Sequence, residues 1–513
     1  MTLRDQGEAF EPELHALPEG WARPRIRDVV SVLQYGISTK ADADERTGLP
    51  ILRMGNIQDG RLDLSDLKYL PRSSRLDAVT LRVGDILFNR TNSPDLVGKS
   101  AIVDVQREMV FASYLIRLRI HDGLVDPRLV TWWINSAWGR RWAAYVRTDG
   151  VSQSNINGTK LAEMLVPLPP RAEQRRIVEK IEALLAQVDA ARGRLAKVQA
   201  ILKRFRQTVL EAACSGGLTE DWRATNASRR INLPDDDDVL GDGRPEELPA
   251  TWAWSRLGVV ASRVTDGTHQ PPPLAPRGIP FLLIGNIASG RIDWGGISKW
   301  VADETYRRLT ARCRPERGDV LYTAVGATFG QALAVDWDHL FVFQRHIAHI
   351  KLRHDLVHTG FLVITLNSLS TYGLATEVAR GAAQPTVTLG DLKRFPVPVP
   401  PLAEQAEIAR RVGALLLLAD AVERRLLIAR RRADTLPQAI VARAFSGNLV
   451  PTEAELARAE GRDYEPASLL LERIRAEHTA APAKGSGRRL LSANGGRLRR
   501  RTSRGRSRAL SPS

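Results

Sequence analysis

Side chains that could perform catalysis are sparse in this sequence. It contains no Gly-x-x-x-x-Gly-Lys-Ser/Thr loop to hold phosphates, no Gly-x-Gly-x-x-Gly after a strand, and no Asn-Pro-Pro-aromatic run of the kind used by amino-methyltransferases. His346 and His349 are three positions apart, but no Cys, Asp or Glu beside them completes a metal set, so we interpret them as strand residues on a polar face. Asp85 and Asp319 each lie between a glycine and an expected strand, which is typical of structural turn residues. A nuclease would need clustered carboxylates for metal ions, and the sequence indicates none.

Polar and basic side chains on loops are better candidates, because Arg and Asn or Gln can each form two hydrogen bonds with guanine or adenine edges. Such residues occur at 88–93, 98–100 and 153–155 in the first half, and at 265–270, 322–328 and 384–386 in the second. Each could equally be a turn residue, and the repeated Gln153 and Gln384 could be internal hydrogen-bond anchors. We predict that the DNA-contacting side chains are Arg90, Asn92, Lys99, Gln153, Asn155, His269, Gln270, Thr323, Thr328 and Gln384.

The elements that must position these loops occur twice. Short motifs of the first half return about 231 positions later, and the offset drifts by a few residues before it recovers, as compensating loop insertions would produce. A period this long indicates a duplicated domain and not a solenoid. The two copies agree at framework positions and differ in the intervening loops. One scaffold used twice should therefore recognise two different targets. The matching segments are 17–21 with 248–252, 55–63 with 285–293, 84–87 with 318–321, 166–170 with 397–401, and 213–216 with 444–447.

Each copy ends in a long amphipathic helix. Apolar residues recur in alternating steps of four and three, the a/d pattern of a helix that packs on another helix. Two matching stripes in one chain are expected to pair with each other, and antiparallel pairing would relate the halves by a pseudo-twofold axis. The stripes are Ile177, Ile181, Leu184, Val188, Ala191, Leu195, Val198, Leu202, Phe205, Val209 and Ala212, and then Ile408, Val412, Leu415, Ala419, Val422, Leu426, Ala429, Ala433, Leu436 and Ile440.

Local signals set the ends of these helices. Double prolines place Pro170 and Pro401 in the first turn, where a missing N–H is tolerated, and the helix dipole favours the carboxylates of Glu173 and Glu404 there. Pro437 predicts a kink or a stop near 433–437. Elsewhere, we expect strands at 279–287, 319–325 and 346–352, and a helix over 128–145 capped by Asp126 and Pro127.

Composition narrows the class of protein. The net charge is +16, but the segment from Lys484 to the C-terminus contains ten Lys or Arg residues and no acidic residue, so much of the excess lies in a tail that we expect to be disordered. That tail either binds nucleic acid nonspecifically or is a solvated extension. Two cysteines fit neither a disulfide framework nor a zinc set, which favours the cytoplasm, and we expect neither an export signal nor a membrane span.

The expected fold class is α+β, with two tandem α/β domains separated by two long helices that form an antiparallel, pseudo-twofold coiled coil. We place the first domain at 1–165, the first helix at 166–214, a linker at 215–247, the second domain at 248–396, the second helix at 397–445 and a C-terminal extension at 446–513.

Two halves, each a variable domain followed by a Pro-Pro-x-x-Glu-Gln helix, resemble the specificity (S) subunit of type I restriction-modification systems. The motif occupies 169–174 and 400–405, and the Leu-Pro-x-x-Trp and Gly-Asp-Ile/Val-Leu segments also resemble the family, over about 14–450 in all. The resemblance implies two target recognition domains that each read half of a bipartite double-stranded DNA site, with the paired helices as spacer and docking surface. It implies two modification (methyltransferase) subunits that bind S-adenosylmethionine and a restriction subunit that uses ATP and magnesium, with no cofactor, metal or catalytic residue on this chain.

Two other functions are open at this point. A coiled-coil scaffold without sequence readout would explain the helices but not the duplicated domains. A self-contained DNA-modifying enzyme would need a methyl-donor or metal site, and the sequence shows neither. A relative with the same architecture that serves another restriction type is a further alternative.

Overall fold

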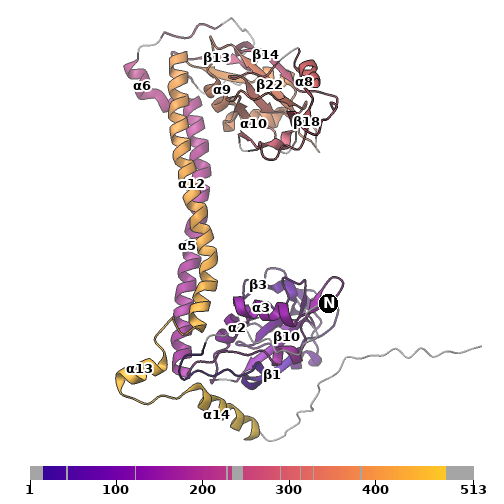
Figure 1. Ribbon diagram of the computed structural model, residues 1–513, viewed down its shortest axis with the longest axis vertical. Helices are drawn as coiled ribbons and strands as arrows, with labels where there is room; N and C mark the ends of the chain where they lie inside the picture. The colour runs from indigo at the N-terminus through magenta and orange to yellow at the C-terminus, as the bar shows by residue number, and fades with distance from the viewer. Residues whose placement is uncertain are drawn as a thin grey trace, which may run out of the picture. The chain divides into compact units, whose positions relative to one another are not determined.

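The computed structural model describes residues 16–41, 44–121, 123–226, 229–233, 247–288, 290–311, 314–326, 328–381 and 384–480. It divides into two compact units, the first formed by 1–186 with 437–513 and the second by 187–436. Both divisions fall inside the two long helices, α5 (Arg171–Cys214) and α12 (Leu402–Phe445), which Figure 1 labels. Each unit therefore combines one predicted domain with part of both helices. No helix in the described ranges is both long and apolar enough to cross a membrane.

The first unit is built on a four-stranded antiparallel sheet in the order β1-β10-β6-β8. Alternate side chains of its strands face opposite ways: Phe88 packs in one core with Trp133, whereas Leu87 packs in another with Leu52. The first core lies under α2 and α3, and the second lies against a three-stranded sheet in the order β5-β2-β9. These strands are β1 (Val30–Tyr35), β10 (Leu115–Ile120), β6 (Ile86–Asn89), β8 (Ser100–Ile102), β5 (Lys68–Leu70), β2 (Leu49–Leu52) and β9 (Val110–Phe111).

The second unit repeats this plan strand for strand. Its main sheet has the order β14-β22-β19-β20, and its smaller sheet, β18-β15-β21, contains one parallel pair as the β5-β2-β9 sheet does. Tyr322 and Leu321 divide between two cores as Phe88 and Leu87 do. The internal duplication inferred from the 231-residue offset is therefore confirmed. The strands are β14 (Ala261–Asp266), β22 (Ile347–Leu352), β19 (Val320–Thr323), β20 (Ala332–Ala334), β18 (Trp300–Val301), β15 (Ile279–Leu282) and β21 (Val342–Phe343).

Short helices and strands complete both units. The helix expected over 128–145 is two helices, because Ser136 ends α2 and its hydroxyl accepts a hydrogen bond from the Gly139 amide at the start of α3. The strand expected over 279–287 is shorter and gives way to a 3-10 turn at Ile284–Asn286. The helices are α1 (Ile26–Val29), α2 (Pro127–Asn135), α3 (Ala137–Val146), α4 (Gly158–Ala162), α7 (Leu257–Val260), α8 (Asp303–Thr310), α9 (Thr359–Leu366), α10 (Leu369–Val378) and α11 (Leu389–Lys393). The remaining strands are β3 (Ile57–Gln58), β4 (Arg61–Leu62), β7 (Thr91–Asn92), β11 (Thr148–Asp149), β12 (Ser154–Asn155), β13 (Ala253–Arg256), β16 (Ile287–Ala288), β17 (Arg291–Ile292) and β23 (Pro396–Val399).

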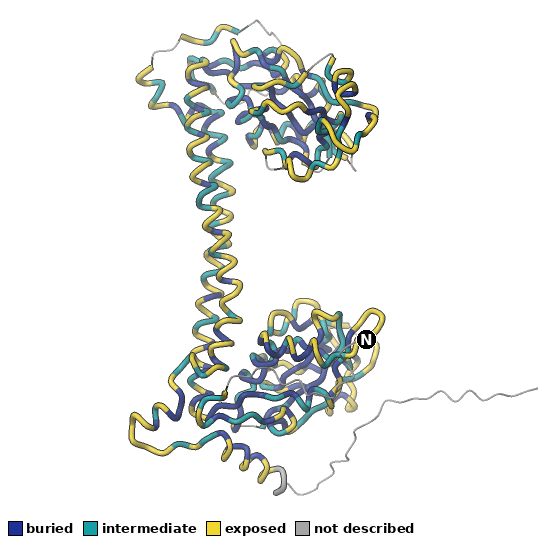
Figure 2. The backbone as a smooth tube through the Cα atoms, viewed as in Figure 1, coloured by how far each residue is buried: buried dark blue, intermediate teal, exposed yellow. Residues whose placement is uncertain are grey.

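In the second unit, α5 and α12 pair antiparallel, as predicted. Residues late in α5 contact residues early in α12, because Arg206 forms ion pairs with Asp420 and Glu423 at 2.5 and 2.8 Å. Residues earlier in α5 contact later ones, because Arg192 lies 3.2 Å from Asp434. The predicted stripe positions Val188, Val209, Ala419, Leu426 and Ala433 are buried, and Figure 2 shows the outer faces of both helices exposed.

The predicted stop at Pro437 is wrong, because α12 continues through the proline to Phe445. A proline inside a helix costs about 3 kcal/mol, since one backbone hydrogen bond is lost. Apolar residues on both sides of it are buried, among them Ala433, Ile440 and Ala444. At about 1 to 3 kcal/mol for each buried side chain, this packing offsets the loss.

Two segments are more ordered than expected. The predicted 215–247 linker begins with a 3-10 turn at Gly217–Thr219 and helix α6 (Glu220–Thr225), and Asp221 pairs with Arg411 at 2.6 Å. The predicted C-terminal extension contains α13 (Glu453–Glu460) and α14 (Ala467–Ala480), whose Leu470 and Ile474 enter the core of the first unit. The acidic run at 235–238 and the basic tail from Lys484 lie outside the described residues.

Candidate nucleic-acid interface

Strand pairing brings the predicted loops of the first unit together. β7 pairs with β12 so that Asn92 lies opposite Ser154 and Thr91 opposite Asn155. The segments at 88–93 and 153–155, which are about 60 residues apart in sequence, therefore form one surface.

Arg90 and Asn155 are linked on this surface. The Arg90 guanidinium donates to the Asn155 side-chain oxygen at 3.4 Å and to the Ser113 carbonyl at 3.2 Å, and it lies 4.9 Å from the centre of the Tyr35 ring. Asn155 in turn donates to the Thr91 hydroxyl at 2.7 Å. Both predicted residues thus already have protein partners, which hold their side chains in defined positions.

The other predicted residues of this unit differ in how free they are. Asn92 accepts a hydrogen bond from the Ser93 amide at 2.8 Å, and the Lys99 ammonium donates to Gln58 at 3.4 Å. Gln153 is exposed. Gln153 is therefore the predicted side chain that a ligand could reach with the least rearrangement.

The second unit brings together two of its three predicted loops. The Gly326 amide donates to the Pro385 carbonyl at 3.0 Å, which joins 322–328 to 384–386. Thr328 and Gln384 are exposed at this junction. Thr323 corrects the prediction: it is fully buried, and its hydroxyl donates to the Thr328 carbonyl at 2.8 Å and accepts from the Gln331 amide at 2.9 Å. Thr323 is the last residue of the inner strand β19, and its hydroxyl holds the loop that follows.

The third segment, 265–270, begins in the last two residues of β14 and continues beyond it, and β22 separates β14 from β19. His269 hydrogen-bonds with the Asp266 carboxylate at 2.9 Å and its side chain is largely exposed, at 64%. The Gln270 carbonyl accepts from the Thr268 hydroxyl at 2.7 Å, and Gln270 is exposed. Strand order therefore does not join His269 and Gln270 to the loop pair that carries Thr328 and Gln384.

The repeated acids Asp85 and Asp319 are structural, as predicted, but they do more than close turns. Asp85 is buried and forms a two-point ion pair with Arg119, with both distances 2.7 Å. Asp319 hydrogen-bonds with His349 at 2.7 Å and pairs with Lys351 at 3.2 Å. The interpretation of His349 as a residue on a polar face is wrong, because this side chain is completely buried against Asp319.

The ionisation of Asp319 follows from these contacts. Burial acts to raise the pKa of the Asp319 carboxyl, but the hydrogen bonds from His349 and from the Glu316 amide outweigh burial and hold that pKa below its ordinary value. Asp319 is therefore a satisfied carboxylate and not a free base. No group of three or more His, Cys, Asp or Glu side chains in the described ranges could hold a metal ion.

Each domain is fixed to its helix by the Glu-Gln pair of the Pro-Pro-x-x-Glu-Gln motif, which we term the Glu-Gln joint. Glu173 accepts a hydrogen bond from the Trp21 indole at 2.9 Å, and Glu404 accepts one from the Trp252 indole at 2.9 Å. Burial raises the pKa of Glu173, although the Glu453 amide and Trp21 donate to its carboxylate. The prediction that these acids lie in the first helical turn is confirmed, and the equal spacing of the tryptophans and glutamates was the signal that could have revealed their contact.

The glutamines complete the joint. Gln405 accepts from the His358 amide at 2.7 Å and donates to the Leu356 and Pro400 carbonyls at 2.9 and 2.8 Å. Gln174 accepts from the Asp126 amide at 2.9 Å and donates to the Pro169 carbonyl at 3.0 Å. The repeated motif therefore connects each helix to its domain through buried hydrogen bonds.

Sequence reasoning missed three polar residues around the first loop pair. Tyr35 lies beneath Arg90 and its hydroxyl accepts from the Gly158 amide at 2.6 Å. Arg147 donates to the Pro94 carbonyl at 2.9 Å, and the Lys160 ammonium donates to the Thr148 hydroxyl at 2.9 Å. Turn pairs lie near Arg147 and Lys160, at Asp149-Gly150 and Asn157-Gly158, but such pairs mark a loop and not its partners. Strand and helix packing is what places the three side chains here.

Comparisons with known proteins agree with this architecture. The family model of the type I restriction modification DNA specificity domain matches residues 18–200 and 290–428. The EcoKI specificity subunit of Escherichia coli K12 is 28% identical over 490 residues, covering 92% of this chain and 98% of that protein. The EcoDI specificity subunit of E. coli is 30% identical and covers 64% of this chain and 72% of its own length.

Solved structures are similar in fold. A chain from a study of complex assembly and conformational transition of the type I restriction-modification system has a TM-score of 0.62 at 22% identity, covering 85% of this chain and all of that one. The HsdS subunit from Thermoanaerobacter tengcongensis has a TM-score of 0.53 at 22% identity, covering 85% of this chain and 98% of its own. The duplicated domains, the paired helices and the family match together lead to one conclusion: this chain belongs to the family of type I restriction-modification DNA specificity proteins.

Proposed function

We propose that this chain is the DNA sequence-specificity subunit of a type I restriction-modification complex. Each domain reads one half of a bipartite double-stranded site, and the paired helices set the spacing and dock the methyltransferase subunits. The chain itself is the non-catalytic, DNA-recognising member of the complex.

One observation carries this proposal: the same sheet and the same Glu-Gln joint occur twice, with different side chains on the loops. At the paired loops, the first unit presents Arg90, Gln153 and Asn155, whereas the second presents Thr328 and Gln384. Because bases are distinguished by the donor and acceptor pattern at their edges, two loop sets with different donors suit two different half-sites.

The partners and cofactors follow from this role. Two modification subunits would bind S-adenosylmethionine and methylate adenine, and a restriction subunit would use ATP and magnesium. This chain would hold none of these groups. This chain would then select the half-site sequences and the adenine to be methylated, while the partner subunits would carry out the chemical reactions.

Domain exchange tests the division of labour. Residues 14–165 are replaced with the corresponding domain of another family member, and the chain is assembled with its modification subunits. Methylated adenines in a random-sequence library should then change in one half-site and stay the same in the other. The reciprocal exchange of residues 248–396 is the matched control and should change only the opposite half-site. A change in both half-sites, or in neither, would refute the two-reader model.

A further inference from the structure

A turn at 344–346, between β21 and β22, connects the predicted loops of the second unit. The Arg345 amide donates a hydrogen bond to the Thr268 carbonyl at 3.1 Å, which holds the turn against the third predicted segment. The His346 carbonyl accepts one from the Ala324 amide at 2.9 Å, which holds the turn against the joined pair of loops. Strand order alone keeps these segments apart, so this turn is what connects them.

The first unit has the same turn, at 112–114. The Ser113 amide donates to a carbonyl of the segment that follows β1 at 2.8 Å, and the next carbonyl accepts from the Arg90 amide at 3.0 Å. The registers of the central strands give the same alignment of the two units. Ser113 and Arg345 are therefore equivalent positions, and so are Arg90 and Ala324.

Both units have an arginine at this turn, but different elements supply it. In the first unit, Arg90 comes from the end of β6, and its guanidinium donates to the Ser113 carbonyl at 3.2 Å above the Tyr35 ring. In the second unit, the equivalent of Arg90 is Ala324, which is only 5% exposed and whose methyl group carries no donor. The arginine of the second unit is instead Arg345, which belongs to the turn itself.

Arg345 supplies a positive charge that the predicted loops of its unit lack, because these loops contain no Lys or Arg. Its side chain is exposed, and no carboxylate among the described residues pairs with it. Burial lowers the pKa of the neighbouring His346 and the charge of Arg345 lowers it further, so His346 is neutral at pH 7. The nearby Arg380 differs, because its charge acts on the Asp391 carboxylate and lowers the pKa of that group.

We propose that Arg345 is a specificity-determining residue, which contacts a guanine in the half-site read by the second domain. The inference rests on the proposed function and names a reading residue within it. The major-groove edge of guanine presents two acceptors, N7 and O6, and a forked guanidinium donates to both at once. Because backbone hydrogen bonds hold the turn on both sides, the arginine starts from a fixed position.

A phosphate contact is the other role open to an exposed arginine. Such a contact would strengthen binding to every DNA sequence, whereas a guanine contact favours one sequence over others. The loops on either side of the turn present hydroxyl and amide groups, at Thr328, Gln384 and Gln270, which are donors and acceptors suited to base edges. The position of Arg345 between these loops therefore favours the guanine contact.

The test assembles the full-length chain with its modification subunits and maps methylated adenines in a random-sequence library. The second domain's half-site is the one that changes when residues 248–396 are exchanged. Arg345→Gln should reduce the preference for guanine at one position of that half-site by about tenfold and leave the other half-site unchanged, because one bidentate contact is lost. Arg345→Lys keeps the charge without the planar fork, so it should keep the overall affinity and lose part of the preference.

Arg353→Gln is the matched control. Arg353 follows the opposite end of β22, and its side chain is 41% exposed, so its loss should change neither half-site. Thermal unfolding of each variant should match that of the parent chain, because both arginines lie at the surface.

Four results would overturn the inference. One is an unchanged guanine preference in Arg345→Gln, and another is a half-site of the second domain that contains no G·C pair. A third is equal weakening on all sequences with a shallower salt dependence, which would identify a phosphate contact. The fourth is a loss of preference in both half-sites. Failure of the parent chain to direct methylation to any bipartite site would instead overturn the proposed function, and this inference with it.

Discussion

At the residue scale, equivalent acids in the two domains have different side-chain partners. Asp85 pairs with Arg119, whereas Asp319 contacts His349 and Lys351. A turn fixes the position of each carboxylate. Asp85 accepts a hydrogen bond from the Arg82 amide, and Asp319 accepts one from the Glu316 amide. The turn therefore fixes the position of the acid, while its partners on the neighbouring strand differ between the two domains.

The Asp319 cluster predicts a pH-dependent stability. Because the pKa of Asp319 is lowered in the folded state, its contribution is present above the ordinary carboxyl pKa of about 4 and is lost as pH falls through the folded-state pKa. Asp319→Asn should destabilise the second unit by about 3 kcal/mol at pH 7, and the difference should shrink toward pH 3. Thermal unfolding at both pH values measures this. Asp338→Asn, at an exposed ion pair with Arg317, is the control and should change little. A deficit of equal size at both pH values would contradict the prediction.

Gln153 predicts a change in specificity without a change in stability. Its side chain is exposed beside Asn155 on the paired loops of the first unit. Gln153→Ala should reduce the ratio of specific to nonspecific DNA affinity by about tenfold, through loss of a base-edge contact in one half-site. Competition binding with matched and scrambled duplexes measures the ratio. Gln106→Ala, an exposed glutamine on another loop of this unit, should leave it unchanged. An unchanged ratio in Gln153→Ala would leave Gln153 as a turn residue.

At the element scale, the Glu-Gln joint explains why each long helix begins where it does. Each helix starts directly after the double proline. A glutamate and a glutamine in its first turn are buried against the domain. Tryptophan and backbone partners satisfy both side chains, so the direction in which the helix leaves the domain is fixed by buried hydrogen bonds. Loops that recognise a DNA sequence need such a rigid support to hold their side chains in place.

Loss of the joint glutamine should loosen this connection. Gln405→Ala removes three hydrogen bonds and leaves the His358 amide without its acceptor, which should cost about 2 to 4 kcal/mol. Hydrogen exchange at the amide of His358 should accelerate first, and thermal unfolding should occur earlier. Gln187→Ala, at an exposed position of the other long helix, is the matched control. Unchanged exchange at His358 would show that the joint is dispensable.

At the scale of the whole molecule, duplication gives each unit its own core and its own share of both helices. The second unit combines α6, which follows the first helix, with the domain that precedes the second helix, and Arg223 of α6 pairs with Glu404 at 2.6 Å. The first unit uses α13 in the corresponding way, where the Glu453 amide donates to Glu173 at 2.9 Å. The segment after each helix therefore closes the joint of the other helix.

The ruler role of the helices predicts a measurable shift in the DNA site. Removal of one heptad from both helices shortens each by about 10 Å and keeps the seam on the same face. The gap between half-sites should shrink by about three base pairs, at about 3.4 Å per base pair. Mapping of methylated adenines in a library with varied gaps measures this. Removal from one helix alone is the control and should abolish binding because the stripes no longer match. Full activity at the original gap would refute the ruler.

Several features of this protein follow from its sequence alone. Heptad periodicity depends only on residue spacing, so it indicated two long helices, and the 231-residue offset indicated two copies of one domain. The family resemblance rested on the same repeated motifs. Local rules failed where tertiary packing competes with them. Pro437 stays helical because Ala433, Ile440 and Ala444 around it are buried, and the start of the predicted 215–247 linker contains α6, whose Arg223 pairs with Glu404.

The tertiary structure alone decided which side chains meet. The pairing of β7 with β12 makes Arg90 and Asn155 neighbours. Thr323 is buried in the sheet, and the buried His349 hydrogen-bonds with Asp319. These contacts join residues far apart in the chain, and no spacing rule encodes them because strand order and register arise from the packing of whole sheets.

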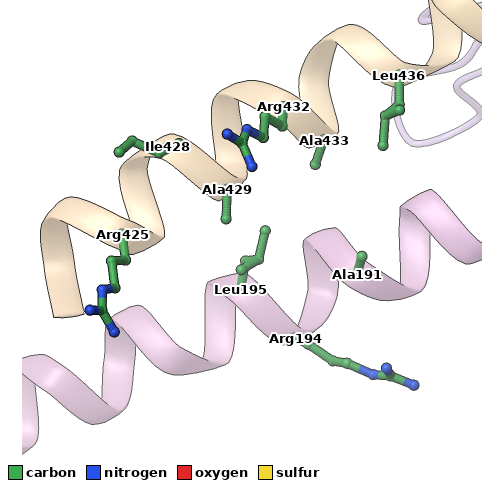
Figure 3. Close-up of a pocket in the computed structure, with 9 residues that line it drawn as sticks. All are labelled: Ala191, Arg194, Leu195, Arg425, Ile428, Ala429, Arg432, Ala433 and Leu436. Carbon is green, nitrogen blue, oxygen red and sulfur yellow. The ribbon is translucent and has the colours of Figure 1, made fainter.

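A groove between the long helices of the second unit has the same origin. Figure 3 shows Leu195 of α5 pointing toward α12, with Ala429 and Ala433 on the facing side. The sequence shows these residues only as separate members of two stripes. The antiparallel register of the helices brings them together, because it sets which part of α12 lies beside each part of α5.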